Sequence, residues 1–211
     1  MIPSKEEWRS ALDSKQGIKV QETLSKATVA ICGLGGLGSN VALMLARAGV
    51  KKLILADFDR VDITNLHRQH YKPEQIGEAK AEALVKNLKE YAPYVEYESH
   101  VERITADNII EIAKEADVIC EAFDKPEAKA ELVNAVLEKM PEKFLTAASG
   151  MAGFESANLI KTKKISGKFY LCGDFSSDVN DGIGLISSRV MVCAAHEANA
   201  IIRILCNKFE A

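Results

Sequence analysis

Apolar and polar positions along the chain follow two periods, and together they predict an α/β fold. Short apolar runs bounded by turn residues are typical of buried strands, whereas apolar residues that recur every three or four positions indicate helices. Strands that alternate with helices imply a doubly wound, mostly parallel sheet, and the last two strands predict an antiparallel C-terminal extension. The predicted strands are 28–32, 52–56, 95–101, 117–122, 144–147, 157–161 and 168–172. The predicted helices are 3–13, 20–27, 37–48, 79–91, 105–114, 127–139 and 189–206.

The order of these elements predicts a single domain over residues 1–211, without internal repeats. Residues 1–26 are a helical lead-in, and Ser4 followed by Glu7 three residues later is the signature of a capping box. Residues 173–188 are rich in Gly, Ser and Asp, so we expect a flexible crossover loop there.

The first predicted strand leads into a glycine-rich turn, Gly33-x-Gly35-x-x-Gly38, which opens a helix. Glycine lets the backbone turn tightly and brings bare N–H groups against a phosphate at a helix N-terminus, as in Rossmann-like folds. Asp57 ends the second strand, where an acidic side chain suits a ribose hydroxyl. We interpret this βαβ unit as a nucleotide-binding site rather than as a turn that only packs.

Composition narrows the class of protein. The chain has 211 residues and a formal net charge of −3, so no basic excess points to nucleic acid or to an anionic membrane surface. No apolar run reaches the roughly 18 residues of a membrane-spanning helix, and the polar N-terminus does not resemble a secretory signal. Five cysteines without a CxxC pair indicate reduced thiols. We therefore expect a soluble cytoplasmic protein.

Charged residues after the second strand discriminate among nucleotides. Arg68 lies in the polar segment after that strand, and Lys80 lies near the start of the next predicted helix. The pyrophosphate of a dinucleotide is satisfied largely by the backbone turn, whereas a triphosphate carries more charge and requires cations at its outer phosphates. A surface arginine and a solvated lysine are the simpler interpretations, but Asn65 and Gln69 flank Arg68 in a recognisable pattern.

Three pieces of the sequence carry a resemblance to a known family. They are GxGGxGS at residues 33–39, the aspartate Asp57 after the second strand, and N-x-x-R-Q from Asn65 to Gln69. Together they resemble the ThiF, MoeB and HesA adenylating enzymes, which are related to ubiquitin-activating enzymes, and most of all the short zinc-less ThiF proteins. The resemblance implies an adenylyltransferase that uses ATP and Mg²⁺. Its substrate would be the C-terminal Gly carboxylate of a ubiquitin-like, ThiS-like sulfur carrier ending in Gly-Gly, for sulfur transfer in thiamine biosynthesis.

The resemblance also assigns roles to individual residues. Arg68 and Lys80 clamp the triphosphate, and Asp124, after the predicted strand 117–122, binds Mg²⁺; these are the implied catalytic residues. Asp59 either assists the metal or caps the following turn. The implied nucleotide-binding residues are Gly33, Gly35, Gly36, Gly38, Asp57, Asp59, Asn65, Arg68, Gln69 and Lys80.

The chain departs from the family pattern in several places. It lacks the two CxxC pairs that bind zinc in bacterial relatives, so we expect no zinc. Residues 174–188 contain no cysteine, which puts a covalent cysteine intermediate in doubt. The usual C-T-D-N around the metal-binding aspartate is replaced by Glu121-Ala-Phe-Asp124-Lys125. Arg9 is the only arginine before Arg47, and Arg47 either reaches the phosphates or serves the end of its helix.

The last predicted helix, 189–206, is rich in small and apolar residues. This composition favours core packing or the interface of a homodimer, which the family pattern also implies. His196 lies on this apolar helix, and we interpret it as a packed or interface histidine rather than a ligand.

Three other functions fit parts of the sequence. A nicotinamide-dependent dehydrogenase uses the same turn, but no Ser-Tyr-x-x-x-Lys set or His/Asp hydride relay is evident. A relative that activates another carboxylate, like the tRNA threonylcarbamoyladenosine dehydratase, is disfavoured by the net acidity. A silent subunit that binds a ubiquitin-like protein is disfavoured because Asp57, Arg68, Lys80 and Asp124 are all retained.

Overall fold

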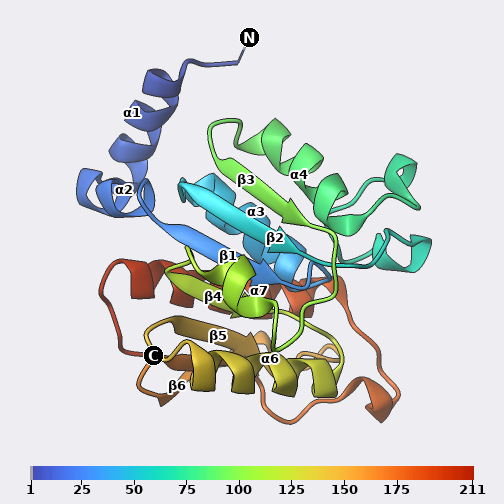
Figure 1. Ribbon diagram of the computed structural model, residues 1–211. Helices are drawn as coiled ribbons and strands as arrows, with labels where there is room; N and C mark the ends of the chain where they lie inside the picture. The colour runs from blue at the N-terminus through green and yellow to red at the C-terminus, as the bar shows by residue number, and fades with distance from the viewer. Residues whose placement is uncertain (1) are drawn as a thin grey trace.

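A seven-stranded sheet with helices on both faces forms the centre of the protein (Figure 1). The structure is a computed structural model and describes residues 2–211. The strands are β1 (Thr28–Cys32), β2 (Lys52–Ala56), β3 (Glu96–His100), β4 (Val118–Glu121), β5 (Phe144–Ala148), β6 (Lys161–Ser166) and β7 (Phe169–Gly173). Their order is β3-β2-β1-β4-β5-β7-β6, and neighbours are parallel except β6 and β7. The predicted doubly wound, mostly parallel sheet with an antiparallel extension is confirmed.

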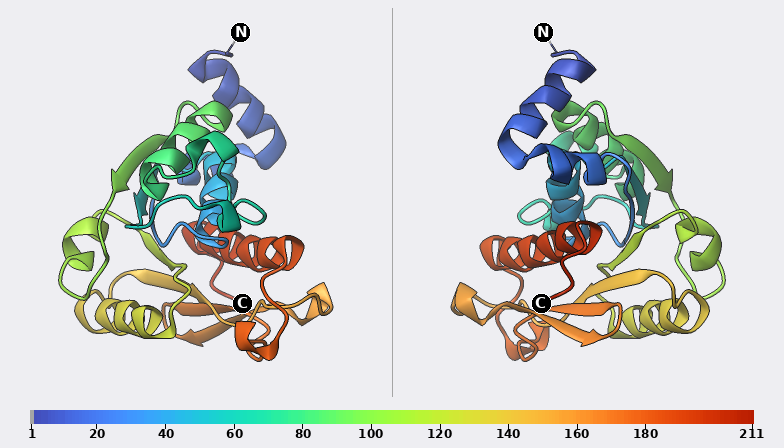
Figure 2. Two further views of the ribbon diagram at one scale, coloured as in Figure 1. Left: turned by 90° about the vertical axis from the view of Figure 1, so that its right-hand side faces the viewer. Right: turned by 90° about the vertical axis from the view of Figure 1, so that its left-hand side faces the viewer.

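The helices divide between the two faces of the sheet. They are α1 (Lys5–Gln16), α2 (Ile18–Leu24), α3 (Gly38–Ala48), α4 (Lys80–Tyr91), α5 (Ile109–Ala113), α6 (Pro126–Lys139) and α7 (Ser187–Leu205). Helices α3, α4 and α7 cover one face, α5 and α6 cover the other, and α1 projects from the body (Figures 1 and 2). Within the described residues, no helix is both long enough and apolar enough to cross a bilayer.

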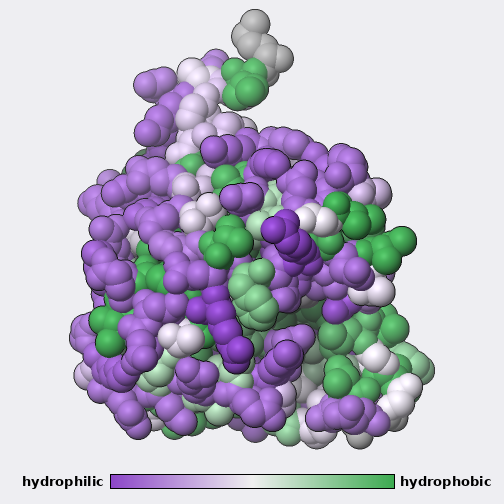
Figure 3. Space-filling view, turned by 45° about the vertical axis from the view of Figure 1, so that its right-hand side comes forward, coloured by the Kyte–Doolittle hydropathy of each residue, from purple (hydrophilic) through white to green (hydrophobic). Residues whose placement is uncertain are grey.

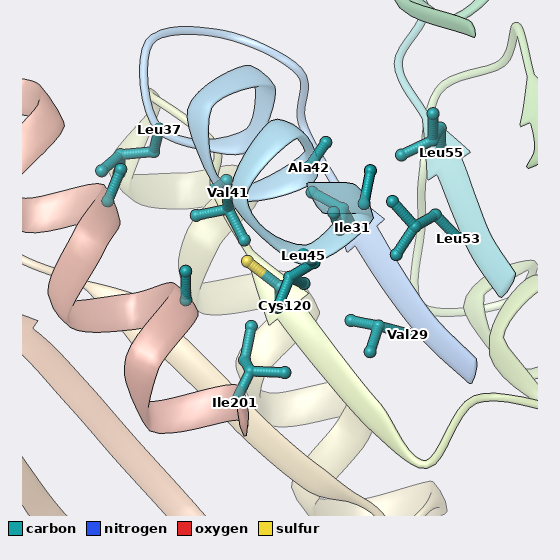
Figure 4. Close-up of a cluster of buried hydrophobic side chains, with 14 of the residues drawn as sticks. Val29, Ile31, Leu37, Val41, Ala42, Leu45, Leu53, Leu55, Cys120 and Ile201 are labelled. Carbon is teal, nitrogen blue, oxygen red and sulfur yellow. The ribbon is translucent and has the colours of Figure 1, made fainter. Parts of the chain in front are cut away.

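Strand β1 is buried on both faces because helices cover both. Its alternating side chains enter two cores: Val29 and Ile31 face α3 and α7, whereas Ala30 and Cys32 face α5 and α6. Figure 4 shows Leu45 of α3 and Ile201 of α7 gathered over this strand. A buried aliphatic side chain of this kind stabilises the fold by about 1.5–3 kcal/mol, which explains why the run is continuously apolar.

The N-terminal capping box is present as predicted. Ser4 Oγ accepts from the Glu7 N–H at 3.2 Å, and the Glu7 carboxylate accepts from the Ser4 N–H at 2.7 Å. Helix α1 extends to Gln16, three residues beyond the prediction, because Gly17 supplies the positive φ that ends it.

Two predicted elements differ from the structure. Residues 157–161 do not form a strand: Ala157–Leu159 is a short 3₁₀ turn begun by Ser156, and β6 starts at Lys161. Strand β6 is an exposed, lysine-rich edge strand, so it has no buried face to create an apolar period. The helix predicted over 105–114 is only α5, because the Thr105 hydroxyl accepts from backbone N–H groups in the turn before it.

Candidate nucleotide-binding site

The carboxyl ends of the parallel strands meet at the right-hand edge of the sheet in Figure 1. In open α/β sheets, ligands bind at this edge where the strand order reverses, here between β1 and β4. Figure 3 turns this edge toward the viewer and shows a hollow there, bordered by hydrophobic residues on its right.

Two glycines of the turn after β1 leave no room for a side chain. A β-carbon on Gly33, where φ is +91°, would stand 2.8 Å from the Ala122 carbonyl oxygen, and one on Gly38 would stand 1.9 Å from the Gly33 oxygen. Helix α3 begins directly at Gly38, and Leu37 at its N-cap makes no side-chain cap. No side chain accepts from the first N–H groups of α3, of which the Ser39 N–H donates to the Gly35 carbonyl at 3.1 Å, and a helix N-terminus without a side-chain cap can bind a phosphate.

Asp57 is buried at the end of β2 and joins this strand to the glycine turn. Its carboxylate accepts from the Leu34 N–H at 2.7 Å and from the Asp59 N–H at 2.8 Å. Burial raises the pKa of Asp57, against these two hydrogen bonds and the charge of Lys80, which lower it. Each carboxylate oxygen keeps a second lone pair, so the geometry permits a further hydroxyl ligand.

Lys80 is buried at the start of α4 and pairs with Asp59. Its ammonium lies 3.1 Å from Asp59 Oδ2, and its backbone N–H donates to the Asp59 carbonyl at 2.9 Å. Lys80 is 6% exposed, and a charge so buried requires a partner. Asp59 thus holds Lys80 beside Asp57. This role differs from the two that the sequence left open for Asp59, which were to assist the metal or to cap the following turn.

Arg68 and Gln69 lie against the glycine turn with polar atoms that have no protein partner. Among the described residues, Arg68 Nε and Gln69 Oε1 are buried and make no hydrogen bond. A β-carbon on Gly36 would stand 3.5 Å from Arg68 Cγ and Cδ, so the arginine stem crosses the turn. Burial lowers the pKa of Arg68, whereas the charge of Asp124 raises it. The orphaned Nε–H of Arg68 is a charged donor beside the glycine turn and fits a nucleotide phosphate, whereas the orphaned Gln69 oxygen fits a hydroxyl or amino donor.

Asn65 organises the loop that carries Arg68. Its side-chain oxygen accepts from the Asp62 N–H at 3.2 Å, and its carbonyl accepts from the N–H groups of Arg68 and Gln69, each at 3.1 Å. The structure therefore gives the Asn65 side chain a local role in the turn and shows no contact with the glycine turn.

Asp124 follows β4 at the same edge and is exposed. The sequence patterns assigned no role to Glu121, which fixes the turn between β4 and Asp124. Its Oε1 accepts from the Phe123 N–H at 2.7 Å, and its Oε2 lies 2.5 Å from Lys129 Nζ. Burial raises the pKa of Glu121, and the charge of Lys129 lowers it. The signal that could have found Glu121 was an acidic residue inside a buried strand with a lysine eight residues later.

No group of three or more His, Cys, Asp or Glu side chains suited to a metal ion occurs among residues 2–211. A metal at this edge would therefore take most of its ligands from phosphates and water, with the exposed Asp124 carboxylate as one protein ligand. Mg²⁺ accepts such an arrangement.

Two arginines singled out in the sequence lie away from the turn. Arg47 is exposed in the last turn of α3, at the opposite end of this helix from Gly38, so the alternative that it reaches the phosphates is wrong. Arg9 pairs with Asp13 at 2.8 Å. His196 is partly buried on α7, with Nδ1 3.1 Å from the Thr162 hydroxyl.

The segment between β7 and α7 makes two contacts that the sequence did not reveal, one to α7 and one to the loop that carries Arg68. Arg189 Nη2 lies 2.6 Å from Asp174 Oδ2 in an ion pair whose side chains are 3% and 4% exposed. His67, next to Arg68, places Nε2 3.2 Å from the Leu185 carbonyl oxygen. The segment therefore borders the loop that carries Arg68.

The chain is similar in sequence to known proteins. The model of the ThiF family matches residues 9–211. The sulfur carrier protein adenylyltransferase of Thermus thermophilus is 39% identical over 109 residues, which are 51% of this chain and 40% of that protein. Adenylyltransferase and sulfurtransferase MOCS3 of Culex quinquefasciatus is 33% identical over 206 residues, which are 93% of this chain and 46% of that protein. The chain thus spans less than half the length of these two relatives.

Two solved structures share the fold. The E. coli tRNA N6-threonylcarbamoyladenosine dehydratase, in complex with ATP, has a TM-score of 0.85 at 20% identity, with 99% of this chain and 98% of that chain covered. E. coli MccB, with AMPCPP and MccA, has a TM-score of 0.69 at 23% identity, with 92% of this chain and 60% of that chain covered. At these identities the likeness establishes the fold.

Proposed function

Because the chain belongs to the ThiF family, we propose that it is an ATP-dependent adenylyltransferase. Its acyl substrate is the C-terminal Gly carboxylate of a small ubiquitin-like sulfur carrier. The observation that carries the proposal is the orphaned buried donor Arg68 Nε over a glycine turn and a helix N-terminus without a side-chain cap. The names of the two curated relatives and the ATP bound to the dehydratase support it.

The reaction joins two negatively charged groups. A carrier carboxylate oxygen attacks the α-phosphorus of ATP, the bond from that phosphorus to the α,β-bridging oxygen breaks, and pyrophosphate leaves with the electron pair. The products are the acyl-adenylate and pyrophosphate. No general base is required, because the carboxylate is already ionised near neutral pH.

The chain's own residues lower the repulsion between these groups. N–H groups of the glycine turn and of the first turn of α3 bind phosphate oxygens. Arg68 and Lys80 supply positive charge at the outer phosphates, where the leaving group develops charge. Asp57 keeps the turn in place through the Leu34 N–H and offers its free lone pairs to the ribose.

Mg²⁺ is part of this proposal, with Asp124 as its protein ligand. When bound, the metal neutralises charge on the phosphates during pyrophosphate departure. Glu121 and Lys129 hold the turn that presents Asp124.

Three finer points also belong to the proposal. The carrier is ThiS-like and serves thiamine biosynthesis. The unit is a single adenylation domain with a flexible crossover loop over residues 173–188. The protein acts as a homodimer, for which the outward face of α7, including the 40% exposed Met191, offers apolar surface.

Activation of a carboxylate on a tRNA base is the second candidate. One observation favours it: edge strand β6 exposes Lys161, Lys163 and Lys164 despite the net negative charge of the chain. Lysines on an edge strand also prevent sheet-to-sheet pairing, so the carrier remains the better-supported substrate.

ATP–pyrophosphate exchange tests the proposal directly. Purified protein, with Mg²⁺ and a small carrier ending in Gly-Gly, should exchange labelled pyrophosphate into ATP. Arg68→Ala should abolish this exchange. Arg203→Ala is the control and should not abolish it, because Arg203 pairs with Glu210 at the far end of α7. Exchange that requires tRNA instead of the carrier would establish the second candidate. Absence of ATP binding would refute both.

A further inference from the structure

Asn40 joins the glycine turn to the loop that carries Arg68. It lies in the first turn of α3, and its side chain is 2% exposed. Its Nδ2 donates to the Gly36 carbonyl at 2.6 Å and to the Arg68 carbonyl at 3.1 Å. One amide group thus bridges two segments that are separated by about thirty residues, at the point where both meet the phosphate cradle.

His70 completes this arrangement. Its Nε2 lies 2.9 Å from Asn40 Oδ1, and its backbone N–H donates to the Ser39 hydroxyl at 3.2 Å. The two carbonyl partners can only accept, so the Asn40 amide nitrogen faces them and its oxygen faces His70. All polar atoms of the Asn40 amide therefore point at the turn or at residues 68–70.

A purely local role does not account for these contacts. A polar side chain in the first turn of a helix often donates to the carbonyl four residues earlier, as Ser39 Oγ does to Gly35 at 2.6 Å. Asn40 makes that bond to Gly36 and a second bond across to Arg68. The second bond fixes the Arg68 backbone while the guanidinium keeps a buried nitrogen unpaired.

We propose that Asn40 is a positioning residue that holds Arg68 over the glycine turn for nucleotide binding. The inference rests on the proposed function, because it acts through the role of Arg68 at the phosphates. Without the bridge, the Arg68 backbone loses its bond to α3 while His70 remains tied to Ser39, so Arg68 is less precisely placed and ATP affinity falls although the fold is retained.

The test compares ATP affinity, measured by titration calorimetry, among single and double variants. Asn40→Ala should weaken ATP binding about tenfold, the scale of one buried hydrogen-bonded amide. Asn40→Ser keeps a hydroxyl that can reach Gly36 but not Arg68, so its ATP affinity should fall nearly as much as that of Asn40→Ala. This variant keeps the test valid if the alanine variant misfolds. In the Arg68→Ala background, Asn40→Ala should add little, because the residue it positions is gone.

Gln21→Ala is the matched control for lost stability. Gln21 is a buried amide, 1% exposed, that donates to the Ala48 carbonyl at 2.7 Å, far from the cradle. It should lower stability as Asn40→Ala does and leave ATP affinity unchanged.

The other outcomes of these titrations separate the positioning role of Asn40 from the proposed function. If Arg68→Ala weakens ATP binding but both Asn40 variants bind normally, the positioning role is wrong and the proposed function stands. The positioning role is equally wrong if the losses add in the double variant. If Arg68→Ala itself has no effect, the assignment of Arg68 fails and the inference fails with it.

Discussion

Lys129 Nζ lies 2.5 Å from Glu121 Oε2, although Glu121 is fully buried at the end of a central strand. The second oxygen of the same carboxylate accepts from the Phe123 N–H. A lysine on α6 thereby keeps a buried charge compensated, and the carboxylate in turn shapes the turn before Asp124.

Lys129→Met should therefore destabilise the protein by about 2–4 kcal/mol at pH 8, because it leaves an uncompensated buried carboxylate. The loss should be smaller at pH 5 than at pH 8, because burial raises the pKa of Glu121 and the variant removes the Lys129 charge that lowers it. Urea unfolding at both pH values measures this. The double variant Glu121→Gln with Lys129→Met should recover part of the loss, and a double variant as unstable as the sum of the single ones would contradict the pairing.

Glycine substitutions in the turn should be costly. Gly33→Ala places a β-carbon 2.8 Å from a backbone oxygen at a φ of +91°, and Gly38→Ala places one 1.9 Å from another. Each should destabilise the fold by more than about 1 kcal/mol and abolish ATP binding, because the backbone must move. Gly167→Ala, with open space around its β-carbon, is the control and should bind ATP normally. If Gly33→Ala bound ATP with wild-type affinity, the glycine turn would not be the phosphate-binding site.

The Asp174–Arg189 pair should fix the segment 173–188. Asp174→Asn should cost about 3 kcal/mol in urea unfolding and accelerate proteolysis within that segment, because it leaves a buried guanidinium uncompensated. The exposed pair Asp107–Lys139, 3.6 Å apart, provides the control, and Asp107→Asn should cost less than about 1 kcal/mol.

The Asp174–Arg189 pair also predicts how the free energy of unfolding changes at acid pH. Burial would raise the pKa of Asp174, but the Ser177 and Ser176 N–H groups, the Ser177 hydroxyl and Arg189 hold it well below its usual range. A lowered folded-state pKa contributes stability above the unfolded value, about 3.9, that is lost as the pH falls below it. The stability difference between wild type and Asp174→Asn should therefore narrow below pH 4. A constant difference would show that the carboxylate charge is not what matters.

Glu197 predicts the opposite dependence, near neutral pH. It is fully buried in α7, where burial and then the charge of Glu121 raise its pKa to about 7. The folded state keeps a proton that the unfolded chain loses above about pH 4.3, so the free energy of unfolding falls as the pH rises toward 7 and then levels off. Relative to Glu197→Gln, wild type should lose about 2–3 kcal/mol between pH 5 and pH 8. Parallel pH profiles would exclude an ionising Glu197.

Local patterns were sufficient for most of the fold. The glycine turn and the capping box at Ser4 depend on residues close together in sequence, so their patterns predicted structure correctly. The prediction misplaced strand β6 because this strand is exposed along its length, and an exposed strand needs no apolar period. Its placement depends on pairing with β7, which sequence periodicity does not record.

The kind of site could be predicted from local sequence patterns: a glycine turn, an acid after β2, and the residues Arg68, Lys80 and Asp124 downstream. The side chains on which those residues depend became visible in the folded chain. Leu34 with Asp57, Asn40 with Arg68 and Glu121 with Lys129 each join separate elements, and their partnership arises when the sheet and its helices close. Buried polar groups must find partners wherever the fold places them, and those distances in space have no counterpart in a local pattern.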